Sequence, residues 1–441
     1  MAPPLHIETI RTEGLGDSTH ILIHDGIAIV VDPQRDLDRF ERVLNDHDAD
    51  LRMVVETHLH NDYVSGGLAM SSQTGAELLM PAGAAPVFRH RPAFHQEDVD
   101  LGSLVIRPIH TPGHTPEHTS YVVVFEGRER AVFSGGSLLV GSAGRTDLLG
   151  EERAESLARL QYGSVIRLAD LPDQVGLYPT HGAGSFCTTS GAGDMTSTIG
   201  AEKKTNPVLL YEDEEAFVKG QLADLVPYPA YYRQMGPMNL RGVGEADLSV
   251  SEIETIPPDA TVVDARPMER YAAGHLPGAL GIELRDSFGT WVGWLTEHNT
   301  PLVLVMDPDQ DTEEAMRQLA RIGYDDIRGI VRHPAGETVS FDVADVRQFA
   351  QAARSGAQIL DVRAPNEWEE GTIEDSILSY VPDVARETPS GLREDEPVWV
   401  LCGSGYRATI AAGILQDRGF EPVVLIEGGA TDVLRQTSND T

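Results

Sequence analysis

The sequence predicts an α/β protein of several domains, with stacked sheets and outer helices followed by two smaller α/β units. Three observations support this fold class. The chain has 441 residues, which is too long for one ordinary core. Short strands and helices alternate along its first half. A stretch of the second half recurs roughly 97 residues further on. We therefore expect an N-terminal domain at 1–205, a linker at 206–248, and repeat domains at 249–338 and 339–441.

Strand signals dominate the N-terminal domain. Two apolar runs flank Asp25-Gly26, which predicts a β-hairpin. Further strands are expected at 53–55, 105–106, 121–125 and 131–133, and helices at 36–46, 66–74 and 151–169. The proline-containing segment that follows predicts a linker with a helix around 212–225.

Each repeat is predicted to run strand, helix, strand, tight loop, helix and strand. Segment 262–266 matches 359–363, and segment 301–305 matches 397–401. In the second repeat the last of these strands leads to Cys402, a glycine-rich turn and a helix over 408–418. Backbone N–H groups in such a turn, together with the helix N-terminus, stabilise a thiolate or persulfide anion. Arg407 adds a fixed positive charge at the end of the turn.

The second repeat, 339–441, resembles the rhodanese family. The resemblance rests on 361–363, on Glu367-Trp368 and on the loop from Cys402 to Arg407. The residues between that cysteine and arginine are Gly403, Ser404, Gly405 and Tyr406. Cysteine-dependent phosphatases have one residue more at this point, so the loop length favours a sulfur atom over a phosphate. The resemblance implies that Cys402 is a nucleophile that carries transferable sulfur.

The first repeat resembles the same family but lacks its reactive residues. Alignment places Met306 opposite Cys402 and Asp311 opposite Arg407. A thioether cannot carry transferable sulfur, and an acidic loop repels an anion. We predict that 249–338 is a catalytically silent domain used for packing or docking.

Histidines follow several strands of the N-terminal domain, where loops gather at one sheet edge. The expected metal-ligating residues are His58, His60, Asp62, His114 and His181. Their motifs resemble the metallo-β-lactamase superfamily over 1–205, which implies an αββα sandwich. Segment 144–147 and the fused rhodanese repeats resemble the persulfide dioxygenase branch of that superfamily.

Enzymes of that branch hold one non-haem iron with two histidines and an aspartate. Carried onto this chain, the histidines fall at His58 and His114, and the aspartate falls on Gly136. Three interpretations remain open. His58, His60 and His114 hold a zinc-like ion, Asp62 replaces the carboxylate of an iron site, or the pocket is polar and metal-free.

Two further residues near these motifs have alternative interpretations. Arg145 binds a substrate carboxylate or is structural. Cys187 is a second sulfur acceptor facing the pocket or a buried structural cysteine. Because the chain has only two cysteines, a disulfide framework is excluded and a reducing cytoplasm is favoured.

The overall charge argues against some classes of binding partner. A net charge of −35 disfavours nucleic acid and anionic membrane surfaces as partners. The sequence predicts a cytoplasmic enzyme that handles a small persulfide or thiosulfate, with sulfur transfer through Cys402 and a persulfide dioxygenase activity in the N-terminal domain. The alternatives are a metal-dependent thioester hydrolase and a non-catalytic sulfur carrier or sensor. The sequence does not decide between a monomer and a homo-oligomer.

Overall fold

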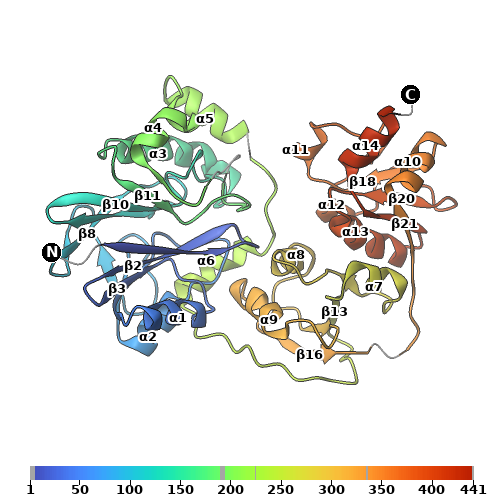
Figure 1. The fold of residues 1–441 in the computed structure, drawn as a ribbon, viewed down its shortest axis with the longest axis horizontal. Helices are drawn as coiled ribbons and strands as arrows, with labels where there is room; N and C mark the ends of the chain where they lie inside the picture. The colour runs from blue at the N-terminus through green and yellow to red at the C-terminus, as the bar shows by residue number, and fades with distance from the viewer. Residues whose placement is uncertain (1–4, 189–193, 224, 334–335, 440–441) are drawn as a thin grey trace. The chain divides into compact units, whose positions relative to one another are not determined.

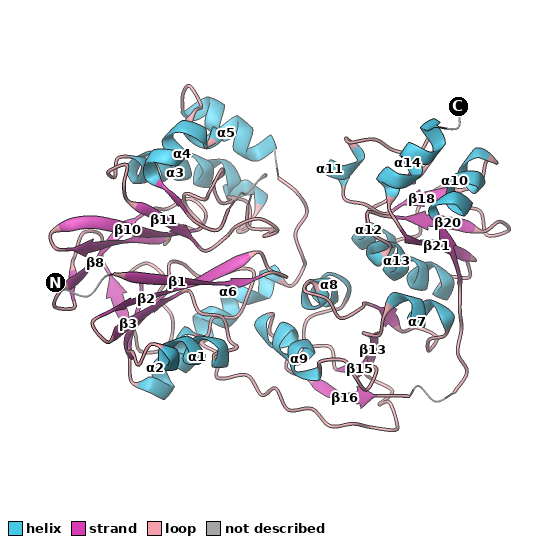
Figure 2. Ribbon diagram, in the orientation of Figure 1, coloured by secondary structure: helices cyan, strands magenta, loops and turns pink. Residues whose placement is uncertain are grey.

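The computed structural model describes residues 5–188, 194–223, 225–333 and 336–439. The chain divides into two compact units, Met1–Asp247 with Ala320–Gly323, and Leu248–Leu319 with Tyr324–Thr441. Each unit mixes helices and strands, which confirms the predicted α/β class (Figures 1 and 2). No helix in the described part of the chain is long and apolar enough to cross a membrane.

Two six-stranded sheets form the centre of the first unit. The first sheet runs in chain order and contains β1 (His6–Thr12), β2 (Asp17–His24), β3 (Ile27–Val31), β4 (Asp50–Val55), β5 (Glu77–Pro81) and β6 (Arg91–Ala93). The second runs in reverse order and contains β12 (Ser197–Thr198), β11 (Gly176–Pro179), β10 (Arg128–Gly135), β9 (Thr119–Phe125), β8 (Leu104–His110) and β7 (Val99–Asp100). Side chains from the two sheets share one buried core, so the sheets are stacked.

Helices cover the outer faces of both sheets (Figure 1). On the first sheet lie α1 (Asp38–Asp46) and α2 (Gly67–Thr74), whose buried side chains pack with those of β2, β3 and β4. On the second lie α3 (Glu151–Ala169), α4 (Ile199–Thr205) and α5 (Glu214–Ala223). The predicted αββα sandwich is therefore confirmed. The predicted hairpin joins β2 and β3 and turns at Asp25 and Gly26, both with the positive φ (52° and 72°) that the turn requires.

The segment predicted as a linker, 206–248, differs from that expectation. It contains a 3₁₀ turn (Pro207–Leu209), α5, where a helix around 212–225 was expected, and α6 (Tyr232–Arg241). Its residues up to Asp247 belong to the first unit. Phe217 and Val218 of α5 are buried in the same core as Ala158 and Val165 of α3. This apolar contact ties the segment to the sandwich.

The second unit contains one sheet for each repeat. The first repeat has the order β14-β13-β15-β16 and the second the order β19-β18-β20-β21-β17. Its strands are β13 (Thr261–Asp264), β14 (Leu280–Gly281), β15 (Leu302–Val305), β16 (Ile327–Val331), β17 (Asp342–Asp345), β18 (Ile359–Asp361), β19 (Ile377–Leu378), β20 (Val398–Leu401) and β21 (Pro422–Glu427). The shared strand order shows that the sequence repeat is a structural repeat.

The three helices of the first repeat are α7 (Met268–Ala273), α8 (Phe288–Leu295) and α9 (Thr312–Arg321). Their counterparts in chain order are α11 (Pro365–Trp368), α12 (Val381–Arg386) and α13 (Tyr406–Asp417). The second repeat adds α10 (Val346–Arg354) and α14 (Ala430–Asn439). Each repeat carries the same buried ion pair, Arg266 with Asp264 and Arg363 with Asp361, both at 2.6 Å. The loops after β15 and β20 therefore occupy equivalent places.

Candidate metal centre and sulfur-carrier loop

The predicted ligands meet at one end of the sandwich. His58, His60 and Asp62 lie on the loop after β4, His114 lies between β8 and β9, and His181 follows β11. All five side chains are buried. The His58 ring centroid lies 4.1 Å from that of His60, 4.9 Å from that of His114 and 5.3 Å from that of His181. The fold thus gathers the residues that the motifs singled out.

His58 and His114 are each held by one ring nitrogen, so the other faces the cluster. The Thr57 hydroxyl donates to Asp32 at 2.7 Å and therefore accepts from Nδ1–H of His58 at 2.8 Å. Nδ1–H of His114 donates to the carbonyl oxygen of Arg145 at 2.8 Å, and its Nε2 has no hydrogen-bond partner among the described residues. Burial beside other imidazoles lowers both pKa values, that of His114 to about 3. Both rings are neutral and present an Nε2 lone pair.

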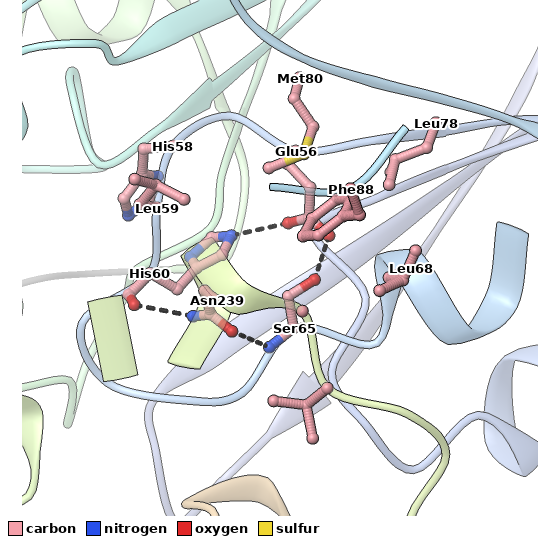
Figure 3. A pocket seen from close by; sticks show the side chains of 12 residues that line it. Glu56, His58, Leu59, His60, Ser65, Leu68, Leu78, Met80, Phe88 and Asn239 are labelled. Carbon is pink, nitrogen blue, oxygen red and sulfur yellow. Dashed lines mark hydrogen bonds and ion pairs between the residues drawn. The ribbon is translucent and has the colours of Figure 1, made fainter. Parts of the chain in front are cut away.

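His60 is oriented from the opposite side. Its Nε2–H donates to Glu56 at 3.0 Å, while Asn239 of α6 donates to its backbone carbonyl at 2.9 Å (Figure 3). Its Nδ1 is buried without a hydrogen-bond partner within the described residues. Burial disfavours the imidazolium, but Asp32 and Glu56 outweigh it and raise the pKa of His60 well above its usual value. The two carboxylates therefore fix the orientation of the His60 ring through Nε2.

A small pocket borders the Glu56 side of these rings (Figure 3). Its apolar lining includes Leu68, Leu78, Met80 and Phe88. Its polar groups, Glu56, Ser65 and Asn239, are already linked by hydrogen bonds to one another or to His60.

His181 connects the histidines to two carboxylates. Its Nδ1–H donates to Asp17 at 2.8 Å and lies 3.3 Å from Asp62, and its Nε2 lies 3.3 Å from Nε2 of His58. Burial lowers the pKa of His181, but Asp62 and Asp17 outweigh it and raise that pKa to about 10. The Nδ1 side of His181 is thus held by the carboxylates, while its Nε2 faces His58.

The residues fit a transition-metal ion. Each of the four rings donates one N–H to a protein acceptor and directs its other nitrogen inward, which is how metal-bound histidines are usually held. The ligand atoms form three groups within 4.8 Å that share His181, one of which adds the carboxylates of Asp17 and Asp62. The other two add histidine or cysteine ligands. One adds His58 and His60, and the other adds His114 and Cys187. Within the described residues, His58, His60 and His114 form no such group, which disfavours the ligand trio expected for a zinc-like ion.

The glycine at position 136 helps to explain why His114 lies apart from the group of His58 and His60. A Cβ on Gly136 would lie 2.8 Å from Nε2 of His114, closer than real contacts allow. The backbone N–H of Gly136 donates to Nε2 of His118 at 2.9 Å. The His114 ring therefore fills space that a side chain at position 136 would need.

The contacts of Arg145 favour the structural one of its two interpretations. Its guanidinium is buried and donates twice to Asp147, at 2.7 Å each, and once to the carbonyl of Phe186 at 2.9 Å. It also stacks over the Tyr228 ring at 4.7 Å. With these donors already engaged, Arg145 is structural, and its own carbonyl orients His114.

Cys187 is fully buried, and its thiol donates to Asp62 at 3.2 Å. Burial and the nearby Asp62 and Asp17 raise its pKa well above the usual value. A protonated, enclosed thiol is a poor nucleophile, which disfavours the sulfur-acceptor interpretation.

The loop after β20 surrounds the second cysteine. Cys402 is 1% exposed, and the backbone N–H of Ser404 points to its Sγ at 3.5 Å. Gly405 has φ +83° and begins α13, and a Cβ there would lie 3.0 Å from the backbone of Ile426. Gly403 and Ser404 are exposed above the sulfur. The thiol therefore lies at the base of a narrow loop, at a helix N-terminus.

Arg407 has a partner that sequence reasoning missed. Its guanidinium forms a two-point ion pair with Glu367, with Nη2 at 2.8 Å from Oε1. Burial opposes ionisation of Glu367, but the hydrogen bond and charge of Arg407 lower its pKa below the usual value. The pair fixes the arginine side chain at the end of the sulfur loop.

The loop after β15 is built differently. Met306 is fully buried. The side chain of Gln310 accepts from the backbone N–H of Asp307 at 2.8 Å, and Arg332 donates to the carbonyl of Asp307 at 2.9 Å. Side chains of the same repeat therefore occupy backbone groups of this loop.

Four buried polar residues around the histidines were not among the predicted site residues. They are Asp17, Asp32, Glu56 and His118. Asp32 and Glu56 directly follow strands β3 and β4, a position that could have marked them. Asp17 gave no such signal, because its contact with His181 spans 164 positions of the chain.

Comparisons with known proteins agree with this architecture. Residues 12–181 match the metallo-beta-lactamase superfamily, and residues 249–331 and 345–436 each match the rhodanese-like domain. The chain is a metallo-β-lactamase domain followed by two rhodanese-like domains. These matches agree with the sequence resemblances.

Curated relatives cover only the N-terminal part. A hydroxyacylglutathione hydrolase from Methylobacterium sp. (strain 4-46) is 34% identical over 142 residues, which is 32% of this chain and 52% of that protein. One from Tolumonas auensis is 34% identical over 161 residues, which is 35% of this chain and 57% of that protein. The chain thus spans about half the length of the curated relatives it matches.

One solved structure matches a larger part of the chain. A metallo-beta-lactamase from Staphylococcus aureus subsp. aureus COL has a TM-score of 0.69 and 27% identity. The match covers 75% of this chain and 100% of that one. The similarity therefore extends beyond the N-terminal domain.

Proposed function

We propose that this protein is an enzyme of persulfide metabolism that transfers sulfane sulfur through Cys402. The observation that carries the proposal is the placement of the Cys402 thiol under a backbone N–H at the start of α13. Such a site stabilises both a thiolate and the persulfide that replaces it. The corresponding loop of the first repeat also lies between a strand and a helix, β15 and α9, but has Met306 in place of the thiol.

The proposed transfer has two steps. In the first, the Cys402 thiolate attacks the outer sulfur of thiosulfate, the S–S bond breaks, and sulfite leaves with the bonding electron pair. In the second, an acceptor such as cyanide attacks the outer sulfur of the Cys402 persulfide, giving thiocyanate and regenerating the thiolate. A low-molecular-weight persulfide loads Cys402 in the same way and leaves as its thiol. Arg407, held by Glu367, offsets the negative charge of the approaching anion.

For the N-terminal domain we propose a metal-dependent reaction on a small thiol-derived substrate. Its buried histidines would hold the ion, and Nε2 of His114 is a buried ring nitrogen that lacks a hydrogen-bond partner in the described structure. A bound iron supplies oxygen chemistry, whereas a bound zinc supplies Lewis acidity and an activated water. Persulfide oxidation has the balance RSSH + O₂ + H₂O → RSH + SO₃²⁻ + 2H⁺. The sulfite formed can accept sulfur from Cys402 persulfide, giving thiosulfate.

Thioester hydrolysis is the second candidate for this domain. It is favoured by the similarity to proteins called hydroxyacylglutathione hydrolases. It is also favoured by Gly136, which removes the carboxylate that an iron site of the persulfide dioxygenase type would use.

The decisive experiment compares three reactions with wild-type protein and the Cys402→Ser variant. We expect thiocyanate from thiosulfate and cyanide, together with a one-sulfur mass increase on Cys402, and loss of both in the variant. Wild-type protein that forms neither thiocyanate nor the persulfide contradicts the proposal. Oxygen uptake with glutathione persulfide identifies the N-terminal domain as a dioxygenase, and thioester turnover that persists in Cys402→Ser identifies it as a hydrolase.

A further inference from the structure

We propose that Cys187 is the anionic ligand of a zinc-class metal centre in the N-terminal domain, together with His114 and His181. The thiolate takes the place of the carboxylate that position 136 lacks. The inference rests on the metal-dependent part of the proposed function and is independent of sulfur transfer through Cys402.

The first support is geometric. The ligand atoms of Cys187, His114 and His181 all lie within 4.8 Å of one another, and all three side chains are fully buried. His114 directs Nε2, which has no hydrogen-bond partner in the described part of the chain, into this group. His181 keeps its Nδ1–H on Asp17 at 2.8 Å. Three protein ligands with one open place is the composition of catalytic zinc sites.

The charge of the ligands distinguishes this group from the group formed by His58, His60 and His181. His58, His60 and His181 offer only neutral nitrogens to a dication, which leaves a buried charge uncompensated. Cys187 supplies a negative charge once the metal displaces its proton to solvent, and Asp62, 3.2 Å from the sulfur, supplies a second nearby. A set of imidazole and thiolate ligands selects zinc over magnesium, calcium or manganese.

The glycine at position 136 both removes the expected carboxylate and leaves room for the His114 ring beside Cys187. Because a side chain there would meet the His114 ring, glycine allows that ring its observed position beside Cys187. The carbonyl of Arg145 then holds the ring through Nδ1–H, at 2.8 Å. The backbone N–H of Arg145 also donates to the carbonyl of Cys187 at 2.9 Å, so one residue fixes both ligands. The buried ion pair of Arg145 with Asp147 stabilises this support.

Cobalt(II) binding tests the inference, because a cobalt–thiolate bond gives an intense near-ultraviolet charge-transfer band. The titration uses full-length, metal-free protein carrying Cys402→Ser, so that Cys187 is the chain's remaining cysteine. We expect the band to appear and saturate at one equivalent. Adding Cys187→Ser should abolish the band and weaken zinc binding about 10- to 100-fold or more in a chelator competition.

Two measurements keep the test decisive if Cys187→Ser does not fold. X-ray absorption of the zinc-loaded Cys402→Ser protein should show sulfur at about 2.3 Å beside nitrogen at about 2.0–2.1 Å. Gly136→Asp, which displaces the His114 ring, should weaken the cobalt band, whereas Gly163→Asp, on a helix face with open space, should not.

Binding of cobalt or zinc without a metal–sulfur signal overturns the role of Cys187 but leaves the metal-dependent function standing. Absence of any metal binding overturns both.

Discussion

The loops after β15 and β20 occupy equivalent places in two repeats, yet only one is built to hold an anion. Cys402 lies under the backbone N–H of Ser404, whereas the loop after Met306 uses its backbone N–H at Asp307 to bind Gln310. The scaffold around them is shared, down to the buried Asp–Arg pair of each repeat. The comparison teaches that the repeat architecture is maintained by strands and buried ion pairs, while reactivity depends on a few loop residues.

The largest expected effect comes from removing the sulfur atom. Cys402→Ser should lower thiosulfate:cyanide transfer by at least about 10³-fold, because a serine hydroxyl neither ionises nor carries sulfur at neutral pH. The matched control is Met306→Leu at the equivalent position, a volume-conserving change expected to leave transfer unchanged. Thiocyanate formation is the measurement. Activity that survives in Cys402→Ser would place the reactive centre elsewhere.

Gly405→Ala tests whether the loop backbone is essential. Its φ of +83° and the 3.0 Å approach of a Cβ to Ile426 should cost about 3 kcal/mol of unfolding free energy. Gly419→Ala, just beyond the other end of α13, is the control. It has φ +90° but open space around it, so about 1 kcal/mol is expected. Urea unfolding measures both, and equal losses would show that contact with Ile426 adds nothing.

Local patterns account for the parts of this molecule that the sequence predicted. The hairpin at Asp25-Gly26 and the Cys402 loop are each encoded within a few neighbouring residues, and the repeat is visible as two similar stretches of sequence. The parts it missed depend on distant pairs. Arg407 and Glu367 are 40 positions apart, and Cys187 and Asp62 are 125 apart. The 206–248 segment was predicted as a linker because its prolines are visible in the sequence, whereas the burial of Phe217 against α3 is not.

Arg407→Gln tests the charge at the end of the sulfur loop. The change leaves the Glu367 carboxylate half-buried without its ion-pair partner and facing an anionic substrate. We expect a loss of about 1–3 kcal/mol in stability and a transfer rate reduced more than tenfold, mainly through weaker thiosulfate binding. The control from the first repeat is Arg270→Gln, because that arginine is 66% exposed and pairs with Asp307 at 3.3 Å. Its loss should cost under about 0.5 kcal/mol. Identical transfer kinetics in the two variants would contradict a role for Arg407.

The smallest expected effect is that a cysteine placed in the first repeat does not restore sulfur transfer. Met306→Cys, made in the Cys402→Ser background, restores a thiol at the equivalent position. We expect no thiocyanate above that background, because Gln310 already accepts the N–H of Asp307 and acidic side chains repel thiosulfate. The smaller side chain also leaves a buried void that costs about 1–2 kcal/mol, so thermal unfolding must accompany the assay. Measurable transfer would show that a cysteine suffices on this scaffold and that the second loop's backbone contributes little.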